Sequence, residues 1–351
     1  MTSSSSMHFF WQPSEHSKWI AAPASQREHI AHTFKPMLAT VLDVNHDFET
    51  DADELKYSGP LYIDFDGKDG LESVIPHFQA CIQKLIDLDV NPAQIRLACS
   101  GGRGFHIEVP MACFMVKPGA TEHLPSIYKL MVKSRWLQTP TIDDVVYSEK
   151  KGRMWRQYNV QRPNGLHKVS ISFSEAMTIT PELYNELCST PRPVLEPATP
   201  TLAGGLAEIF SGMQRKQAAE RVKKDARKRE TSKVGAALKE RFHTRGAALP
   251  PSLLLLAAGK VDSPKGFNQI AMQLGVTAEA MGLSEDQLIT LCTSLIANHK
   301  GDGSKYNTPR KREEQLRDQY RNACDGDLNL SIGGIRSIMP ASMPCNDLRG
   351  F

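Results

Sequence analysis

The stretch from residue 59 to residue 110 constrains the fold more than any other part of the sequence. Residues 60–66, Pro-Leu-Tyr-Ile-Asp-Phe-Asp, form an apolar and aromatic run that begins with proline and stops at a glycine, which is the pattern of a β-strand. Residues 70–89 have apolar side chains at helical spacing. Strands are then predicted at 94–100 and 105–110, joined by a Gly-rich turn. This order of elements predicts an α/β or α+β domain.

The flanking segments give weaker patterns. Residues 1–55 mix aromatic and polar side chains and predict helix and loop. A further helix is expected at about 121–137, and β structure at 145–147 and 168–173. These elements complete a first domain that we place at residues 1–188.

The composition changes after Cys188. Residues 189–200 are rich in proline and threonine, which is typical of a linker. Residues 215–245 contain twelve Lys or Arg against four acidic residues, which suits either a solvated helix or binding to a phosphate backbone. Helical patterns follow, with an expected capping box at Ser284 and Gln287 and an expected helix start at Thr308 and Pro309. We therefore expect a Pro-rich then basic linker or helix at 189–246, a helical domain at 247–340 and a tail at 341–351.

The composition excludes several classes of protein. With 351 residues, 40% hydrophobic and 23% charged, the chain resembles globular proteins of about two domains. Its longest apolar run is far shorter than the roughly 20 residues that a membrane span needs, and the N-terminus has no secretory signal pattern, so we expect no membrane partner. The seven cysteines are scattered without a CxxC pair. We therefore expect no zinc and a reducing cytoplasm as the location.

Asp64 and Asp66 form the first group of residues whose side chains suit catalysis or metal binding. Strand side chains alternate, so residues two apart share a face. Two neighbouring carboxylates repel each other unless a cation lies between them, and carboxylate oxygens suit Mg²⁺ or Mn²⁺. The alternative is an ordinary exposed acidic pair at a strand end.

The second group is the segment from Ser100 to Glu108, Ser-Gly-Gly-Arg-Gly-Phe-His-Ile-Glu. Its glycines leave backbone N–H groups accessible to an anion, and Ser100 and Arg103 offer donors for phosphate oxygens. His106 is expected on the polar face of the following strand. The spacing matches neither a Walker loop nor a Rossmann fingerprint. A surface hairpin is the alternative interpretation.

The third group begins at Asp143 and Asp144, which precede an apolar pair. Cations follow within the next residues: Arg153, Arg156, Arg162 and Lys168. Acids that bind metal beside cations that bind phosphate are the components of a phosphoryl-transfer site. A basic surface loop is the alternative.

The ordered set of DxD, SGxRGxH and an apolar residue followed by Asp resembles the archaeo-eukaryotic primase superfamily, over about residues 62–172. The resemblance implies an α+β fold, with an RRM-like β sheet and flanking helices, followed by a C-terminal helical domain. Residues 305–312 and 330–333 also resemble the helical domains of mobile-element primases. The implied activity is a DNA primase that makes primers on single-stranded DNA from NTPs or dNTPs by two-metal nucleotidyl transfer. A replicative helicase is an implied partner.

The resemblance also implies roles for individual residues. The implied Mg²⁺ or Mn²⁺ ligands are Asp64, Asp66 and Asp143, with Asp144 as a possible substitute for the third. The implied contacts to the nucleotide triphosphate are Ser100, Arg103, His106, Arg156 and Arg162. The sequence departs from the family at 159–162, where many relatives have Ser-x-His and this chain has Asn-Val-Gln-Arg, so Arg162 is the proposed substitute.

Two alternatives to a primase remain open from the sequence. One is a gap-filling or translesion primase-polymerase that extends existing primers. The other is a replication-initiation protein that binds DNA without catalysis. The complete set of acids and the intact Gly-rich segment favour an enzyme.

Overall fold

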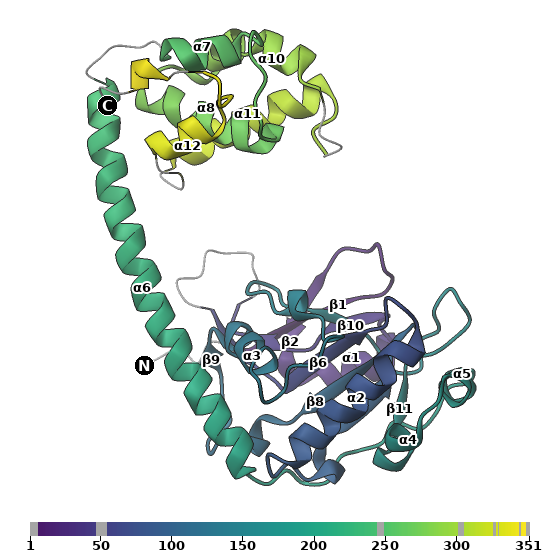
Figure 1. The fold of residues 1–351 in the computed structure, drawn as a ribbon. Helices are drawn as coiled ribbons and strands as arrows, with labels where there is room; N and C mark the ends of the chain where they lie inside the picture. The colour runs from purple at the N-terminus through teal and green to yellow at the C-terminus, as the bar shows by residue number, and fades with distance from the viewer. Residues whose placement is uncertain are drawn as a thin grey trace. The chain divides into compact units, whose positions relative to one another are not determined.

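The computed structural model describes residues 6–46, 55–243, 249–300, 305–325, 328, 330–343 and 345–348. The chain divides into two compact units, Met1–Glu220 and Arg221–Phe351 (Figure 1). Unit 1 combines antiparallel sheets with helices and belongs to the α+β class, as predicted. No helix in the described ranges has both the length and the apolar character to cross a membrane.

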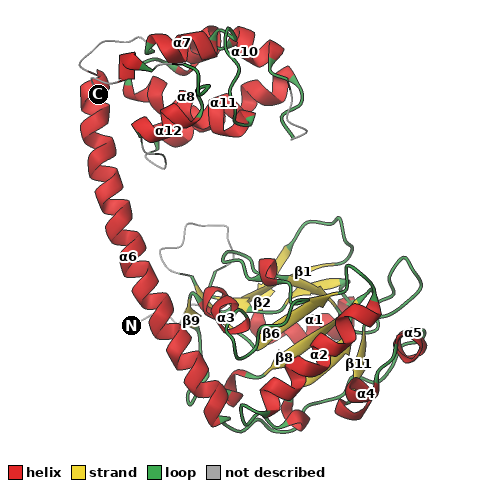
Figure 2. Ribbon diagram, in the orientation of Figure 1, coloured by secondary structure: helices red, strands yellow, loops and turns green. Residues whose placement is uncertain are grey.

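The first sheet of unit 1 has the order β11-β7-β8-β6, with every neighbouring pair antiparallel. Its strands are β6 (Leu61–Asp66), β7 (Arg96–Cys99), β8 (Gly104–Val109) and β11 (Val169–Ile171). Helix α2 (Leu71–Ile86) lies across one face (Figure 2), where the Phe78 ring stacks on Phe105 and meets Phe65 edge-on. Because strand side chains alternate, Asp64 and His106 project from the opposite face.

The second sheet covers that opposite face and was not predicted. It has the order β10-β3-β1-β4-β5-β9, and β2 pairs with β1. Its bounds are β1 (His8–Gln12), β2 (Ile20–Pro23), β3 (Leu38–Thr40), β4 (Asp43–Val44), β5 (Lys56–Ser58), β9 (Thr121–Glu122) and β10 (Met154–Arg156). The prediction of helix and loop for 1–55 was therefore wrong at β1 to β4, whereas the 3₁₀ turn η1 (Ala24–Gln26), helix α1 (Arg27–Phe34) and the described loops between these elements agree with it. The strands are short, and Phe9, Phe10 and Trp11 are all buried, so no apolar-polar alternation marks them.

The predicted β structure at 145–147 was also wrong. Asp144–Val146 form a 3₁₀ turn, η4, because the Asp143 carboxylate accepts a hydrogen bond from the Val145 N–H and caps it. Tyr147 is buried by packing on the Tyr62 ring, at 4.8 Å between centroids. Burial without a strand thus accounts for Val146 and Tyr147, whereas Val145 is exposed. The other short elements are η2 (Pro92–Gln94), η3 (Met111–Cys113), α3 (Leu124–Val132), α4 (Phe173–Thr178) and α5 (Pro181–Cys188).

The Pro-rich segment after Cys188 is not a loose linker. The Leu195 N–H donates to the Ser170 hydroxyl at 3.2 Å, and the Gln94 amide donates to the Thr199 carbonyl at 2.7 Å. Helix α6 (Gly204–His243) then begins with Leu206 and Phe210 buried in the core of unit 1. The boundary between the two compact units consequently falls within α6, after Glu220.

Unit 2 consists of helices in its described residues. They are the end of α6, α7 (Pro251–Ala257), α8 (Phe267–Ala280), α9 (Glu285–Leu291), α10 (Thr293–Asn298), α11 (Pro309–Cys324), α12 (Ile332–Ser337) and the 3₁₀ turn η5 (Asn346–Leu348). The predicted capping box at Ser284 and the predicted start at Thr308 and Pro309 are both confirmed. Gly275 lets α8 approach α11 closely, since a Cβ there would lie 2.9 Å from the backbone of Gln319.

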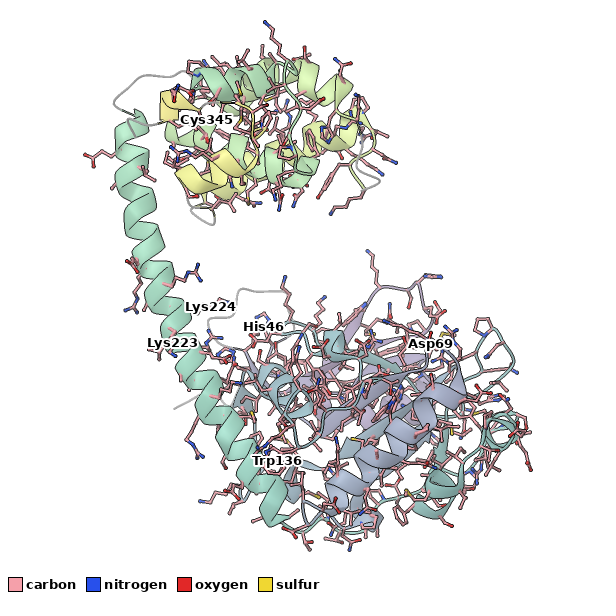
Figure 3. The ribbon with its side chains drawn as sticks, viewed as in Figure 1. His46, Asp69, Trp136, Lys223, Lys224 and Cys345 are labelled. Carbon is pink, nitrogen blue, oxygen red and sulfur yellow. The ribbon has the colours of Figure 1, made fainter. Side chains whose placement is uncertain are left out.

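The basic run belongs to α6, and its position on a helix agrees with the prediction. Lys223 and Lys224 lie on this helix with exposed side chains (Figure 3). Arg245 of the run lies outside the described residues. An exposed cationic helix fits both interpretations of the run, a solvated surface and a phosphate-binding surface.

Candidate active site

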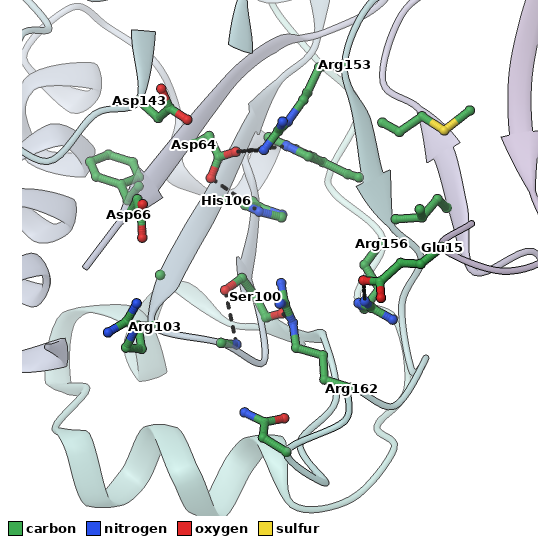
Figure 4. Close-up of a pocket in the computed structure, with 17 residues that line it drawn as sticks. Glu15, Asp64, Asp66, Ser100, Arg103, His106, Asp143, Arg153, Arg156 and Arg162 are labelled. Carbon is green, nitrogen blue, oxygen red and sulfur yellow. Dashed lines mark hydrogen bonds and ion pairs between the residues drawn. The ribbon is translucent and has the colours of Figure 1, made fainter. Parts of the chain in front are cut away.

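A pocket of about 520 Å³ opens between the two sheets of unit 1, beside the ends of β6 and β8 (Figure 4). Every residue that the sequence predicted for the site lines it: Asp64, Asp66, Ser100, Arg103, His106, Asp143, Arg156 and Arg162. Segments separated by up to about a hundred residues in the chain thus meet at one place. Their roles in metal and nucleotide binding remain predictions.

The three acids come together through backbone pairing at the free edge of β6. The Asp143 N–H donates to the Asp64 carbonyl at 2.9 Å, and the Asp66 N–H donates to the Thr141 carbonyl at 3.0 Å. Asp64 is buried, with 8% of its surface exposed, whereas Asp66 at the strand end is exposed. Asp143 therefore lies beside Asp64 because a backbone hydrogen bond joins the two residues at the edge of the sheet.

Asp144 lies differently from its neighbour. It does not line this pocket but an adjacent one of about 470 Å³. Its carboxylate forms an ion pair with Lys133 at 2.7 Å, and hydrogen bonding to Lys133 holds its pKa below the usual range. The geometry favours Asp143 over Asp144 as the third acid of the site.

The environment of Asp64 suits a cation. Burial raises its pKa, Arg153 opposes that shift, and the nearby negative charge of Asp143 adds to it. In the described residues no three His, Cys, Asp or Glu side chains already converge on a single point. Carboxylates that repel one another relax together only around a cation, and their oxygens are hard ligands. The donor set fits Mg²⁺ or Mn²⁺.

His106 lies directly opposite Asp64 on the paired strand β8. Its Nε2 is 3.5 Å from Asp64 Oδ1, and its ring stacks on the Trp155 indole at 3.9 Å between centroids and 10° between planes. Burial first, and then the positive charge of Lys168, lower its pKa well below the usual value. The imidazole is therefore neutral at pH 7. Its Nδ1 is buried and has no hydrogen-bond partner among the described residues.

The Gly-rich turn between β7 and β8 forms the floor of the pocket. Gly101 adopts a φ of +71°, and a Cβ on Gly104 would lie 1.8 Å from the Phe65 carbonyl oxygen on the paired strand. The Ser100 hydroxyl accepts a hydrogen bond from the Gly102 N–H at 3.3 Å. Arg162 fastens the turn by donating from Nε to the Ser100 carbonyl at 2.8 Å. Glycine is required here by close backbone approach as well as by conformation.

Four arginines line the pocket: Arg103, Arg153, Arg156 and Arg162. Arg153 is 3.5 Å from the Asp64 carboxylate. Arg156 is buried and pairs with Glu15, which extends from the loop between β1 and β2. An anion that binds Arg156 through Nη2 therefore competes with the Glu15 carboxylate.

Sequence reasoning missed three contributors to the pocket. Arg153 was noted among the phosphate-binding cations of the basic segment but was not assigned to the site, and Trp155 and Glu15 were not considered. Trp155 carries a recognisable signal, because it lies between two of the arginines in the sequence. Glu15 carries none, since its approach depends on the pairing of strands that the sequence did not reveal.

Comparisons with known proteins give one match to report. No protein-family model matches the chain, and no curated protein matches it. Among solved structures, one described as the crystal structure of primase RepB′ matches with 12% sequence identity and a TM-score of 0.30, over 91% of this chain and 94% of that chain. The chain is similar to that primase at this low level, and the comparisons do not show a family.

Proposed function

We propose that the chain is a DNA primase, a nucleotidyltransferase that starts primers on single-stranded DNA from NTPs or dNTPs. The observation that supports this function is the composition of one pocket, where Asp64, Asp66 and Asp143 meet four arginines. Carboxylates that bind a divalent cation, next to cations that bind phosphate, are what nucleotidyl transfer requires.

Asp64, Asp66 and Asp143 are the proposed ligands of Mg²⁺ or Mn²⁺. When bound, these ions supply Lewis-acid activation of a 3′-hydroxyl and neutralise the pyrophosphate that leaves. The buried position of Asp64 keeps water away from its carboxylate and strengthens the interaction with a cation. The exposed Asp66 leaves the open side of the pocket free for the nucleic acid.

The arginines and the Gly-rich turn are the proposed contacts for the triphosphate. Arg103 reaches the pocket from the turn itself, and its guanidinium is exposed to an incoming anion. Arg162 already braces Ser100, so a phosphate bound there would contact a preformed structure. The neutral His106 adds no charge to a site that holds four arginines, and its single N–H can donate either to Asp64 or to a phosphate.

The test is synthesis on unprimed single-stranded DNA with Mg²⁺ or Mn²⁺ and labelled NTPs or dNTPs in turn. Asp64→Asn and Asp143→Asn should each lower the rate by about a hundredfold or more. Asp144→Asn is the matched control and should retain activity, because Asp144 pairs with Lys133 outside the pocket. Equal activity of all three variants would rule out the metal site.

Two other results would point to the alternative functions. Extension of annealed primers without de novo synthesis would indicate a gap-filling polymerase. DNA binding without any incorporation would indicate a non-catalytic replication-initiation protein. A mobile-element role and a helicase partner are further proposals, which need pull-down experiments with the replication proteins of a host.

A further inference from the structure

We propose that Trp155 is a positioning residue that fixes the orientation of the Asp64 carboxylate and the His106 ring. It does so as the middle layer of a stack formed by Lys168, Trp155 and His106. The proposal rests on the proposed function, because it assigns Asp64 to metal binding.

Trp155 connects the two sheets of unit 1 at the pocket. It belongs to β10, whereas Asp64 and His106 lie on β6 and β8 of the other sheet. Its indole Nε1–H donates to Asp64 Oδ2 at 3.3 Å, and its ring lies almost parallel to the His106 imidazole. Only 4% of the Trp155 surface is exposed. One side chain thus contacts both the proposed metal ligand and its cross-strand neighbour.

Lys168 covers the other face of the indole. Its Nζ lies 4.9 Å from the Trp155 ring centroid and 4.6 Å from that of Tyr158. Since the imidazole occupies one face of the indole, the ammonium has to lie on the opposite face. Lys168 is 2% exposed, and within the described residues its ammonium forms neither a hydrogen bond nor an ion pair. Its contacts are cation–π contacts, which stabilise the indole plane on the face opposite His106.

The hydrogen bond has a specific consequence for Asp64. The terminal torsion of an aspartate is broad and has no strong preference of its own, so its hydrogen bonds decide how the carboxylate is rotated. Oδ1 faces His106 Nε2 at 3.5 Å, and Oδ2 receives the indole N–H. Residues that orient a metal ligand in this way commonly decide how tightly the metal binds.

Trp155→Phe separates positioning from packing, because phenylalanine still stacks but cannot donate a hydrogen bond. Mn²⁺ binding without nucleotide is measured by titration calorimetry, and nucleotide KM and kcat by primer synthesis. We expect the Mn²⁺ Kd of Trp155→Phe to rise by about tenfold, with kcat at fixed metal falling and nucleotide KM changing little. Trp136→Phe is the matched control, since Trp136 is half-exposed and outside the pocket; it should behave as the unsubstituted protein.

A second measurement observes Trp155 itself in the unsubstituted protein. The indole N–H signal of Trp155 in a ¹⁵N spectrum should shift when Mg²⁺ is added, and Asp64→Asn should abolish the shift. The signal is assigned by substituting the other three tryptophans. An unmoved Trp155 signal at saturating Mg²⁺, or equal Mn²⁺ affinity of Trp155→Phe and Trp136→Phe, overturns the proposal.

These outcomes separate a failure of the positioning role of Trp155 from a failure of the proposed primase function. If Asp64→Asn binds Mn²⁺ and synthesises primers as well as the unsubstituted protein, the metal site itself is wrong. If Asp64→Asn loses both while Trp155→Phe matches Trp136→Phe, the metal site stands and only the positioning role of Trp155 is wrong.

Discussion

Lys168 shows how a single buried charge makes stability depend on pH. Burial lowers the pKa of its ammonium from an ordinary 10.5 to about 8. Between those two values the unfolded chain holds a proton that the folded chain has lost, so the free energy of unfolding gains a contribution that rises with pH. We expect the stability of the unsubstituted protein relative to Lys168→Met to increase from pH 7.5 to pH 10. Urea unfolding at both pH values measures it.

The exposed Lys117 provides the control variant. Lys117→Met also replaces a lysine by methionine, and it should change stability little because the side chain is exposed. A stability difference for Lys168→Met that is independent of pH would contradict a lowered pKa.

At the same scale, the sequence predicted the acids, the Gly-rich turn and three of the four arginines of the pocket, because each has a chemical type and spacing that can be recognised locally. Asp64 and Asp66 share a face by strand alternation alone. The sequence position of Trp155 between two arginines is a recognisable signal, but its contact with Asp64, like that of Glu15 with Arg156, depends on pairing between distant strands and could not be predicted. Local patterns specify which groups can do chemistry, and tertiary pairing specifies which groups orient them.

Among the elements, the turn between β7 and β8 gives a prediction that separates folding from function. Gly104→Ala would force a Cβ to within 1.8 Å of the Phe65 carbonyl oxygen, so β6 and β8 must separate, and we expect a loss of stability of about 2 kcal/mol or more. Gly102→Ala meets the flexible Arg162 guanidinium at 3.3 Å. That variant should fold normally but raise the nucleotide KM. Thermal unfolding and primer-synthesis kinetics check both, and a reversal of the two effects would contradict the geometry.

The lengths of the strands also show why the N-terminal sheet was not predicted. Strands β3 and β10 have three residues each and pair across more than a hundred positions. Runs this short carry little alternation, and β11 (Val169–Ile171), which is equally short, was predicted only as part of the longer run 168–173. By contrast, β6, α2 and β8 are predicted from the sequence because each is long enough for its apolar periodicity to be recognised.

In the described residues each unit has its own large hydrophobic core, and this changes where the chain should be cut. The core of unit 1 includes Leu206, Ile209 and Phe210 from the start of α6, and the core of unit 2 is formed by residues after the boundary at Glu220. A fragment that ends at Cys188 loses those three buried side chains. We expect it to be much less stable than a fragment 1–220, since removing one large core side chain already costs about 3–5 kcal/mol. Thermal unfolding of the two fragments compares them.

The fragment 1–220 then tests the division of labour between the two units. It keeps the whole pocket and should extend an annealed primer at a rate close to that of the full chain. It should start primers poorly, because initiation has to order a template and two nucleotides without a duplex, at a large entropic cost. Unit 2 and the basic part of α6 would hold the template in place through phosphate contacts, which weaken steeply with salt. Primed and unprimed single-stranded DNA at low and moderate salt provide the comparison. Equal initiation by fragment and full chain would show that the helical unit has another role.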